Sequence, residues 1–234
     1  MAEDPAQELR ELTAGLVAWL RYQRRLGRWG VPEEPPPRPS AEAPAPGPVP
    51  TLGEVREELG DCQRCKLGRT RTHLVFGEGS PRAALMFIGE GPGEEEDLQG
   101  LPFVGAAGQL LNNLLSKLGL KREEVYIANV VKCRPPGNRE PEAGETAACL
   151  PFLKKQIDAI RPRVIVTLGR VATQALLMTQ APLTRLRGRW QRYGQIPVMP
   201  TFHPSYLLRF PQERHKTWED MQQVMEELAA HEEI

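Results

Sequence analysis

Four short apolar runs alternate with helical patterns along the chain, and this alternation constrains the fold more than any other feature of the sequence. The runs have the length of buried strands and cover residues 84–88, 125–131, 164–168 and 196–200. The helical patterns cover residues 106–118, 143–160, 170–178 and 215–231. This order predicts an α/β fold with three layers, α/β/α, around a mainly parallel four-stranded central sheet.

Two residues mark the predicted helices. Gly119 directly follows the first helical pattern and fits a C-cap. Pro151 falls inside the second pattern, so a kink or a split is expected there.

The N-terminal part of the chain differs from the rest. Residues 31–50 contain nine prolines among twenty residues, which excludes a helix or central strand and predicts an extended linker. Residues 5–29 place leucines at helical spacing and predict an amphipathic helix. The predicted organisation is an N-terminal helix in residues 1–30, a linker in 31–50 and one domain in 51–234. The helix either docks on a partner or folds back onto its own domain.

The overall charge gives little information, because the formal net charge is zero at pH 7. Arginine outnumbers lysine by 23 to 7, which favours bidentate contacts to phosphate or carboxylate groups. No apolar run approaches the roughly 20 residues needed to span a bilayer, and the N-terminus does not resemble a signal peptide. We therefore expect a soluble, cytoplasmic protein.

Residues 89–97 read Gly-Glu-Gly-Pro-Gly-Glu-Glu-Glu-Asp and follow the first predicted strand directly. Open α/β sheets bind their ligands at this end of a strand. Five carboxylates beside a glycine-rich backbone suit a close-fitting pocket. A dinucleotide-binding loop is disfavoured, because Glu94 replaces the third fingerprint glycine and the carboxylates would repel a pyrophosphate.

The chain has four cysteines, Cys62, Cys65, Cys133 and Cys149. The first two form a CxxC pair, and the other two follow the second predicted strand, so the four could close one metal site. Zinc and a [4Fe–4S] cluster both accept four thiolates, and the spacing leaves the choice open. The alternative is a buried pair with two unrelated core cysteines.

Three segments, in order, resemble the motifs of the family 4 uracil-DNA glycosylases. The first is residues 89–97 with the following Gly-Leu-Pro-Phe-Val-Gly of residues 100–105. The others are Asn-Val-Val-Lys-Cys-Arg-Pro-Pro at 129–136 and Phe-His-Pro-Ser-Tyr-Leu-Leu-Arg at 202–209. The resemblance covers about residues 52–230, with the four cysteines at the expected places. It implies a monomeric, nucleoid-associated DNA repair hydrolase of base excision repair, which flips uracil out of DNA and leaves free uracil and an abasic site.

The resemblance assigns three residues to the base. Phe103 would stack on the flipped uracil, and Asn129 would read its Watson–Crick edge, because an amide both donates and accepts. His203 would donate to uracil O2 as negative charge develops there. The alternatives are a core phenylalanine, a turn-forming asparagine and a structural histidine.

The resemblance also implies roles for the glycine- and carboxylate-rich loop. Glu90 would orient or deprotonate the attacking water and stabilise the cationic sugar. Glu96 would border uracil C5 and help to exclude thymine, and Gly89 and Gly91 would offer backbone groups to the base. The other carboxylates of the loop form either a solvated acidic face or the charged start of a helix.

Two segments are candidates for binding DNA. Arg185, Arg187, Arg189 and Arg192 lie near Trp190, between the third and fourth predicted strands. This mixture suits phosphate contacts and stacking, and the alternative is a solvated run of charges. After His203, an apolar pair could wedge into the duplex or could form a helical turn that packs inward; this segment contributes Tyr206, Leu207 and Arg209.

The resemblance favours the [4Fe–4S] cluster over zinc and gives it a structural role. Neither the first nor the last motif contains a lysine, so we expect a monofunctional glycosylase that leaves the abasic site uncut. Residues 134–139 contain no histidine, so we expect turnover rather than covalent trapping of the base. The N-terminal helix would bind a replication or repair protein. The competing interpretation is a non-enzymatic iron–sulfur or zinc nucleic-acid-binding module, which explains the cysteines and arginines but not Phe103, Asn129 and His203.

Overall fold

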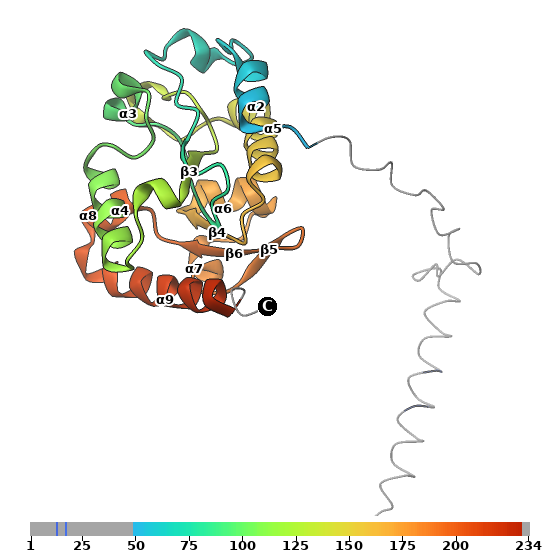
Figure 1. Ribbon diagram of the computed structural model, residues 1–234, viewed down its shortest axis with the longest axis vertical. Coiled ribbons are helices and arrows are strands. Elements are labelled where there is room, and N and C mark those ends of the chain that lie inside the picture. The colour runs from blue at the N-terminus through green and yellow to red at the C-terminus, as the bar shows by residue number, and fades with distance from the viewer. Residues whose placement is uncertain (1–12, 14–16, 18–48, 231–234) are drawn as a thin grey trace, which may run out of the picture. The chain divides into compact units, whose positions relative to one another are not determined.

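The computed structural model describes residues 49–230 together with Thr13 and Val17. These two residues are helical, and Val17 is 45% exposed. The rest of the predicted N-terminal helix, and all of the predicted linker except Val49 and Pro50, lie outside the described residues. The paragraphs below concern residues 49–230, shown in colour in Figure 1.

A central sheet organises the domain. In the described residues it has six strands in the order β1-β3-β2-β4-β6-β5. The inner four are parallel and match the predicted runs; they are β2 (Leu85–Gly89), β3 (Tyr126–Asn129), β4 (Val164–Leu168) and β6 (Ile196–Thr201). The predicted number of four strands was wrong. The antiparallel edge strands β1 (Glu78–Gly79) and β5 (Gln191–Tyr193) were missed because they are too short to form an apolar run.

The four predicted helices are present. They are α4 (Ala106–Lys117), α5 (Ala143–Ile160), α6 (Arg170–Leu177) and α9 (Arg214–Ala230). Gly119 follows α4 with a φ of 74°, as expected just past a helix end. Pro151 lies inside α5, which runs through it as one helix, so the expected split does not occur.

Several short helices were not predicted as elements, although the starts of α3 and α8 were each expected as one of two alternatives. Their apolar periodicity is too brief to detect. They are α2 (Leu52–Leu59), α3 (Glu94–Gln99), α7 (Leu183–Leu186) and α8 (Pro204–Arg209), with 3-10 turns η1 (Lys66–Arg69), η2 (Arg122–Glu124), η3 (Pro136–Asn138) and η4 (Pro211–Glu213).

The strands bury side chains on both faces, which gives the predicted three layers. Along β2, Met86 and Ile88 join a core with helices α5 and α6. Leu85 and Phe87 join the opposite core with helices α4 and α9. Alternating side chains of a fully buried strand therefore serve two different cores. Figure 1 shows the sheet between these helices.

The strand order reverses at β2. The chain passes from β2 outward to β3 and then returns to β4 on the other side of β2. Ligands of open α/β sheets bind beyond the carboxyl ends of the strands at such a switch point. Here those ends are Gly89 with Glu90, and Leu168 with Gly169.

Candidate functional site

The carboxyl ends of the four parallel strands open into one cleft of about 840 Å³. Each strand contributes at least one residue at or just beyond its end. The lining includes the three residues expected to contact uracil, Phe103, Asn129 and His203, together with Glu90, Gly91 and Glu96. Side chains that the sequence spreads over more than one hundred positions therefore meet at one edge of the sheet.

Asn129 and Phe103 converge on Gly89. Gly89 pairs with Asn129 in the register of β2 and β3. A Cβ added at Gly89 would lie 2.4 Å from Asn129 Oδ1 and 2.6 Å from Phe103 Cζ, so any larger residue would displace both side chains. The Gly89 carbonyl accepts the Val130 N–H at 2.9 Å, so this carbonyl already has a backbone hydrogen-bond partner.

Asn129 Oδ1 has no hydrogen-bond partner in the described part of the chain, although the residue is only 1% exposed. A buried acceptor left unpaired costs about 1–3 kcal/mol. Such an orphan is unusual in a folded protein and calls for an explanation. A ligand with an N–H group placed beside Gly89 would satisfy it.

Phe103 has an unusual backbone. It is 5% exposed and has a φ of 51°, which is costly for a residue with a side chain. The start of α4 packs against it so closely that a Cβ on Gly108 would lie 1.8 Å from the Phe103 carbonyl oxygen. The ring centroid lies 5.6 Å from that of His203, with the two planes tilted by 36°. The fold thus holds this ring in a fixed place beside His203.

The contacts of His203 define which nitrogen carries its proton. The Ser205 N–H donates to Nδ1 at 3.1 Å, and Ser205 Oγ lies 2.7 Å from the same atom. Desolvation lowers the pKa of His203 to about 4; Glu96 opposes this shift and Arg209 adds to it. A neutral ring that accepts at Nδ1 carries its hydrogen on Nε2. His203 therefore offers one N–H donor without a positive charge.

Glu90 extends the β2 edge into the cleft. Its backbone carbonyl accepts the Val131 N–H at 3.1 Å, which fixes the main chain. Burial raises the pKa of Glu90 to about 7; the Glu140 carboxylate adds to the shift and Arg170 opposes it. A carboxyl group that titrates near neutral pH can exchange a proton with water under physiological conditions.

The Glu96 carboxylate accepts hydrogen bonds from nearby backbone N–H groups. Its Oε1 accepts the N–H groups of Val104 and Gly105, both at 2.9 Å, and its Oε2 accepts that of Gly93 at 3.1 Å. The predicted contact with uracil C5 stays a prediction. The observed contacts make Glu96 the residue that joins the loop after β2 to the loop that carries Phe103.

The remaining carboxylates of the loop begin helix α3, where negative charges complement the helix dipole. Glu94 and Glu95 are exposed, as expected of an acidic face. Asp97 is 3% exposed, and its carboxylate accepts the Thr72 N–H at 2.9 and 3.0 Å. It therefore anchors a second segment rather than facing solvent.

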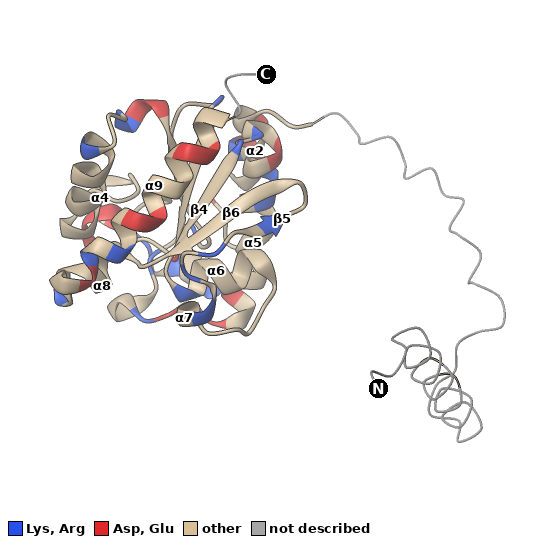
Figure 2. Ribbon diagram, turned by 90° about the horizontal axis from the view of Figure 1, so that it is seen from below, with Lys and Arg blue, Asp and Glu red and all other residues tan. Residues whose placement is uncertain are grey.

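Arg185 and Arg189 are exposed, whereas Arg187 is half-buried. Its Nη1 donates to both carboxylate oxygens of Asp220, at 2.7 and 2.9 Å, and Asp220 is 1% exposed. Breaking such a pair would leave a buried charge uncompensated. The contacts therefore give Arg187 a structural place. Basic and acidic residues are interspersed near α6, α7 and α8, with no single basic face in this view (Figure 2).

The segment after His203 forms helix α8. Leu207 is 5% exposed, so it packs inward as one of the two expected alternatives and cannot wedge into a duplex. Leu208 is 41% exposed and lines the cleft with Tyr206 and Arg209. Tyr206 stacks on Phe202 with ring centroids 4.8 Å apart. The exposed members of α8 are thus Ser205, Leu208 and Arg209.

The cysteines lie in one region, where N–H groups point at three of their sulfurs. Arg64 donates to Cys62 Sγ at 3.3 Å, Arg71 to Cys133 Sγ at 3.2 Å, and the Lys132 N–H to Cys149 Sγ at 3.3 Å. Burial raises the pKa of the Cys149 thiol, and the negative charges of Cys62 and Cys65 add to this shift. Among the described residues, no group of three or more His, Cys, Asp or Glu side chains is arranged to hold a metal ion.

A buried lysine connects this region with the cleft. Lys132 is 0% exposed, and its Nζ donates to the Asn129 carbonyl at 2.9 Å and to Gln156 Oε1 at 2.5 Å. Gln156 in turn donates to the Phe76 carbonyl at 2.9 Å. The polar contacts of Lys132 and Gln156 therefore fix the strand end that carries Asn129.

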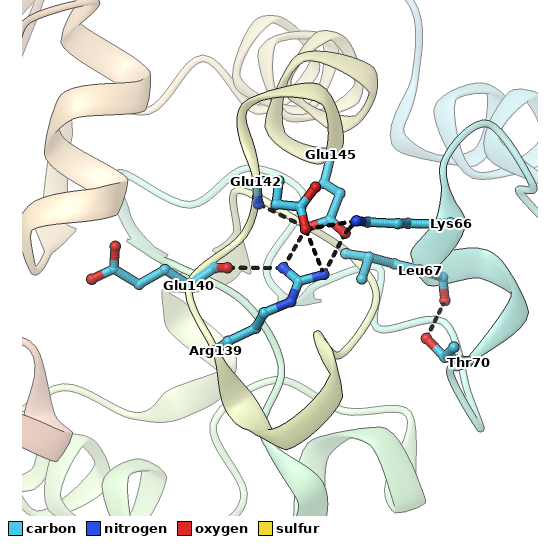
Figure 3. Close-up of polar contacts among 7 residues, drawn as sticks. All are labelled: Lys66, Leu67, Thr70, Arg139, Glu140, Glu142 and Glu145. Carbon is cyan, nitrogen blue, oxygen red and sulfur yellow. Dashed lines mark hydrogen bonds and ion pairs between the residues drawn. The ribbon is translucent and has the colours of Figure 1, made fainter.

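The loop between β3 and α5 is held by the ion pairs in Figure 3. Arg139 donates to both oxygens of Glu145 at 2.8 Å, and Glu145 is 2% exposed. Lys66, next to Cys65, pairs with Glu142 at 2.6 Å. These contacts join the two cysteine-bearing segments of the chain.

The comparisons with known proteins agree with the resemblance. The profile of the uracil DNA glycosylase superfamily matches residues 76–229. The chain belongs to this superfamily. Among its relatives is a type-4 uracil-DNA glycosylase of Saccharolobus solfataricus, 47% identical over 188 residues, which cover 76% of this chain and 87% of the relative. The type-4 enzyme of Thermotoga maritima is 51% identical over 159 residues, 66% of this chain and 82% of the relative.

Similarity extends to a second type within the superfamily. A type-5 uracil-DNA glycosylase of Pyrobaculum aerophilum is 32% identical over 146 residues, 55% of this chain and 64% of the relative. The type-4 relatives match at higher identity and over more of the chain. Within the described part of the chain, no helix is long and apolar enough to cross a membrane.

Sequence reasoning missed several residues of this glycosylase site. Ser205 fixes the histidine tautomer, and its place two residues after a histidine at a helix start was a detectable signal. Glu140 and Arg170 also line the cleft, but one follows a proline-rich turn and the other begins a helix far along the chain. No spacing rule brings these two together.

The tautomer leads to a prediction. We expect the His203 ring to stay neutral, with its proton on Nε2, from about pH 8 to about pH 5, because its folded pKa lies below the usual value of about 6.5. Since the unfolded state binds this proton first, the ring should weaken the fold as the pH falls from about 6.5, the unfolded pKa, to about 4, the folded pKa. Nitrogen NMR of the imidazole, with exposed His215 as a reference, measures both the proton position and the titration. A ring that titrates near its usual pKa would contradict the assignment.

Proposed function

We propose that this chain is a monofunctional uracil-DNA glycosylase, which takes uracil out of DNA and hydrolyses its N-glycosidic bond to leave an abasic site. The observation that carries the proposal is the unpartnered Asn129 Oδ1, which lies beside Gly89 and the Phe103 ring. Superfamily membership supplies the reaction class. Uracil offers N3–H to Oδ1 and O4 to the amide N–H, so one asparagine can pair with its edge.

The cleft suits departure of a uracil anion. Phe103 provides a flat apolar surface for the flipped base. His203 Nε2–H would donate to uracil O2 as negative charge grows there, and a neutral donor that is already oriented needs no rearrangement at that moment. Ser205 acts through His203, because its N–H keeps Nδ1 as the acceptor.

Glu90 is proposed to serve the sugar side. Its carboxylate would orient or deprotonate the attacking water and stabilise positive charge on the sugar. Glu96 would border the base at C5, held in place by its three backbone N–H contacts. On the DNA side, the exposed Arg185, Arg189 and Arg209 are proposed to contact phosphates.

Cys62, Cys65, Cys133 and Cys149 are proposed to hold a [4Fe–4S] cluster with a structural role. Three sulfurs already accept N–H groups, which suits anionic thiolates. Cys62 and Cys65 lie near enough to Cys149 to raise the pKa of its thiol. When bound, it would tie the segment before the sheet to the segment after β3.

We also propose that the enzyme is a cytoplasmic, nucleoid-associated monomer with three parts, residues 1–30, 31–50 and 51–234. The first part would bind a replication or repair protein through its apolar stripe. Deletion of residues 1–50 should then leave uracil excision from short oligonucleotides within a few-fold of the full chain. Loss of activity or of thermal stability on deletion would show that these residues belong to the catalytic domain.

The central test is release of uracil from an oligonucleotide that contains it. We expect wild-type protein to excise uracil, and we expect His203→Ala and Asn129→Ala each to slow single-turnover excision by about 10²–10³-fold while DNA binding persists. His215→Ala and Asn113→Ala, which change the same residue types outside the cleft, serve as matched controls. The proposal fails if wild-type protein releases no uracil, and a role fails if its variant keeps the normal rate.

Glu90 should give the reaction a pH dependence. Because burial and Glu140 raise the pKa of Glu90 to about 7 and the ionised form is the active one, excision should accelerate as the pH rises through about 7 and then level off. Glu90→Gln should be slow and lose this step, whereas exposed Glu123→Gln should keep the wild-type profile. A Glu90→Gln enzyme with an unchanged rate and profile would remove Glu90 from the reaction.

The cluster proposal has its own measurement. Anaerobically purified protein should be brown and contain about four iron atoms per chain, and Cys133→Ser should lower both the iron content and the thermal stability. Ser116→Ala, at an exposed position of α4, serves as the control variant. A colourless protein with stoichiometric zinc and full activity would overturn the cluster.

A further inference from the structure

Two charged side chains at the strand-order switch are not used by the proposed reaction. Arg170 begins α6 directly after β4, and Glu140 lies in the loop between η3 and α5. Their side chains form an ion pair, and both line the cleft. The Arg170 side chain is 46% exposed and that of Glu140 is 61% exposed, so solvent and ligands can reach the pair.

The loop presents Glu140 to Arg170 by a specific arrangement. The Arg139 guanidinium donates to both carboxylate oxygens of Glu145, lies 3.4 Å from Glu142 Oε1, and donates to the Glu140 backbone carbonyl at 2.9 Å. Figure 3 shows that the Glu140 side chain points away from Glu142 and Glu145. The ion pair of Arg139 with the buried Glu145 thus fixes the loop, while the Glu140 side chain is 61% exposed.

The pair also lies next to the reaction centre. Both members affect the pKa of Glu90, Glu140 by raising it and Arg170 by lowering it. An exposed ion pair contributes about 0–1 kcal/mol, so a competing anion can replace the carboxylate at little cost. A guanidinium binds phosphate with the same geometry that it uses for carboxylate.

We propose that Arg170 binds a backbone phosphate beside the flipped nucleotide, and that Glu140 occupies the Arg170 guanidinium until this phosphate displaces it. The proposal rests on the proposed function, because DNA is the source of the phosphate. In the protein without DNA, the Glu140 carboxylate occupies the position on Arg170 that the phosphate takes in the complex. It therefore reduces binding of DNA by competition. Arg170 is a substrate-binding residue.

Binding measurements across a series of salt concentrations test this assignment. The probe is a duplex carrying one 2′-fluoro-2′-deoxyuridine, whose fluorine slows cleavage of the glycosidic bond. We expect Arg170→Gln to weaken binding about fivefold to tenfold and to lower the salt slope by about 0.9, the value for one lost phosphate contact. Glu140→Gln should tighten binding about twofold to fivefold, and the double variant should behave like Arg170→Gln.

Arg82→Gln is the matched control, since exposed Arg82 precedes β2 at the opposite end of the strand from the cleft. Thermal denaturation checks that each variant is folded. The proposal is overturned if Arg170→Gln changes the salt slope no more than Arg82→Gln does. It is also overturned if Glu140→Gln weakens binding, because Glu140 would then support Arg170 rather than compete with DNA. A third contrary result is that Glu140→Gln tightens binding equally in the Arg170→Gln background, which would show a general effect of charge.

The same proteins separate this proposal from the proposed function. Uracil release by wild-type protein is measured on the matching duplex with ordinary deoxyuridine. If uracil is released while the Arg170→Gln slope is unchanged, only the phosphate assignment fails. If no uracil is released, the proposed function fails whatever the slopes show.

Discussion

The parallel pairing of β2 with β3 on one side and β4 on the other is the constraint on which the site depends. It places Gly89 opposite Asn129 and brings Leu168 and Gly169 to the same edge. Parallel strands share a direction, so their carboxyl ends must meet. A residue with a Cβ at position 89 would displace the side chains of Asn129 and Phe103. The strand pairing and the shape of the pocket therefore both depend on this glycine.

The polar groups of the site are positioned by hydrogen bonds to other groups of the protein. Ser205 sets the tautomer of His203, Glu96 joins two loops through backbone N–H groups, and Lys132 holds the Asn129 carbonyl. These supports leave one donor on His203 and one acceptor on Asn129 directed at a ligand. Supporting contacts of this kind keep a site oriented before the substrate arrives, which is where catalytic stabilisation by fixed donors comes from.

Charge in the cleft is balanced locally rather than by the whole chain. The formal net charge is zero, yet Glu140 and Arg170 lie close enough to Glu90 to act on its pKa, Glu140 by raising it and Arg170 by lowering it. A DNA-binding protein without a net positive charge must rely on such individual guanidinium groups. The structure distinguishes the arginines by their surroundings: Arg187 pairs with a buried aspartate, whereas Arg170 and Arg209 line the cleft.

The sequence by itself determined the α/β class, the four inner strands, the long helices and the family, because apolar periodicity and local motifs are properties of neighbouring residues. It also indicated Phe103, Asn129 and His203 through their motifs. Only the tertiary structure decided the edge strands β1 and β5, the inward packing of Leu207, the anchoring of Glu96 and the meeting of Glu140 with Arg170. These depend on contacts between distant segments, which no local pattern encodes.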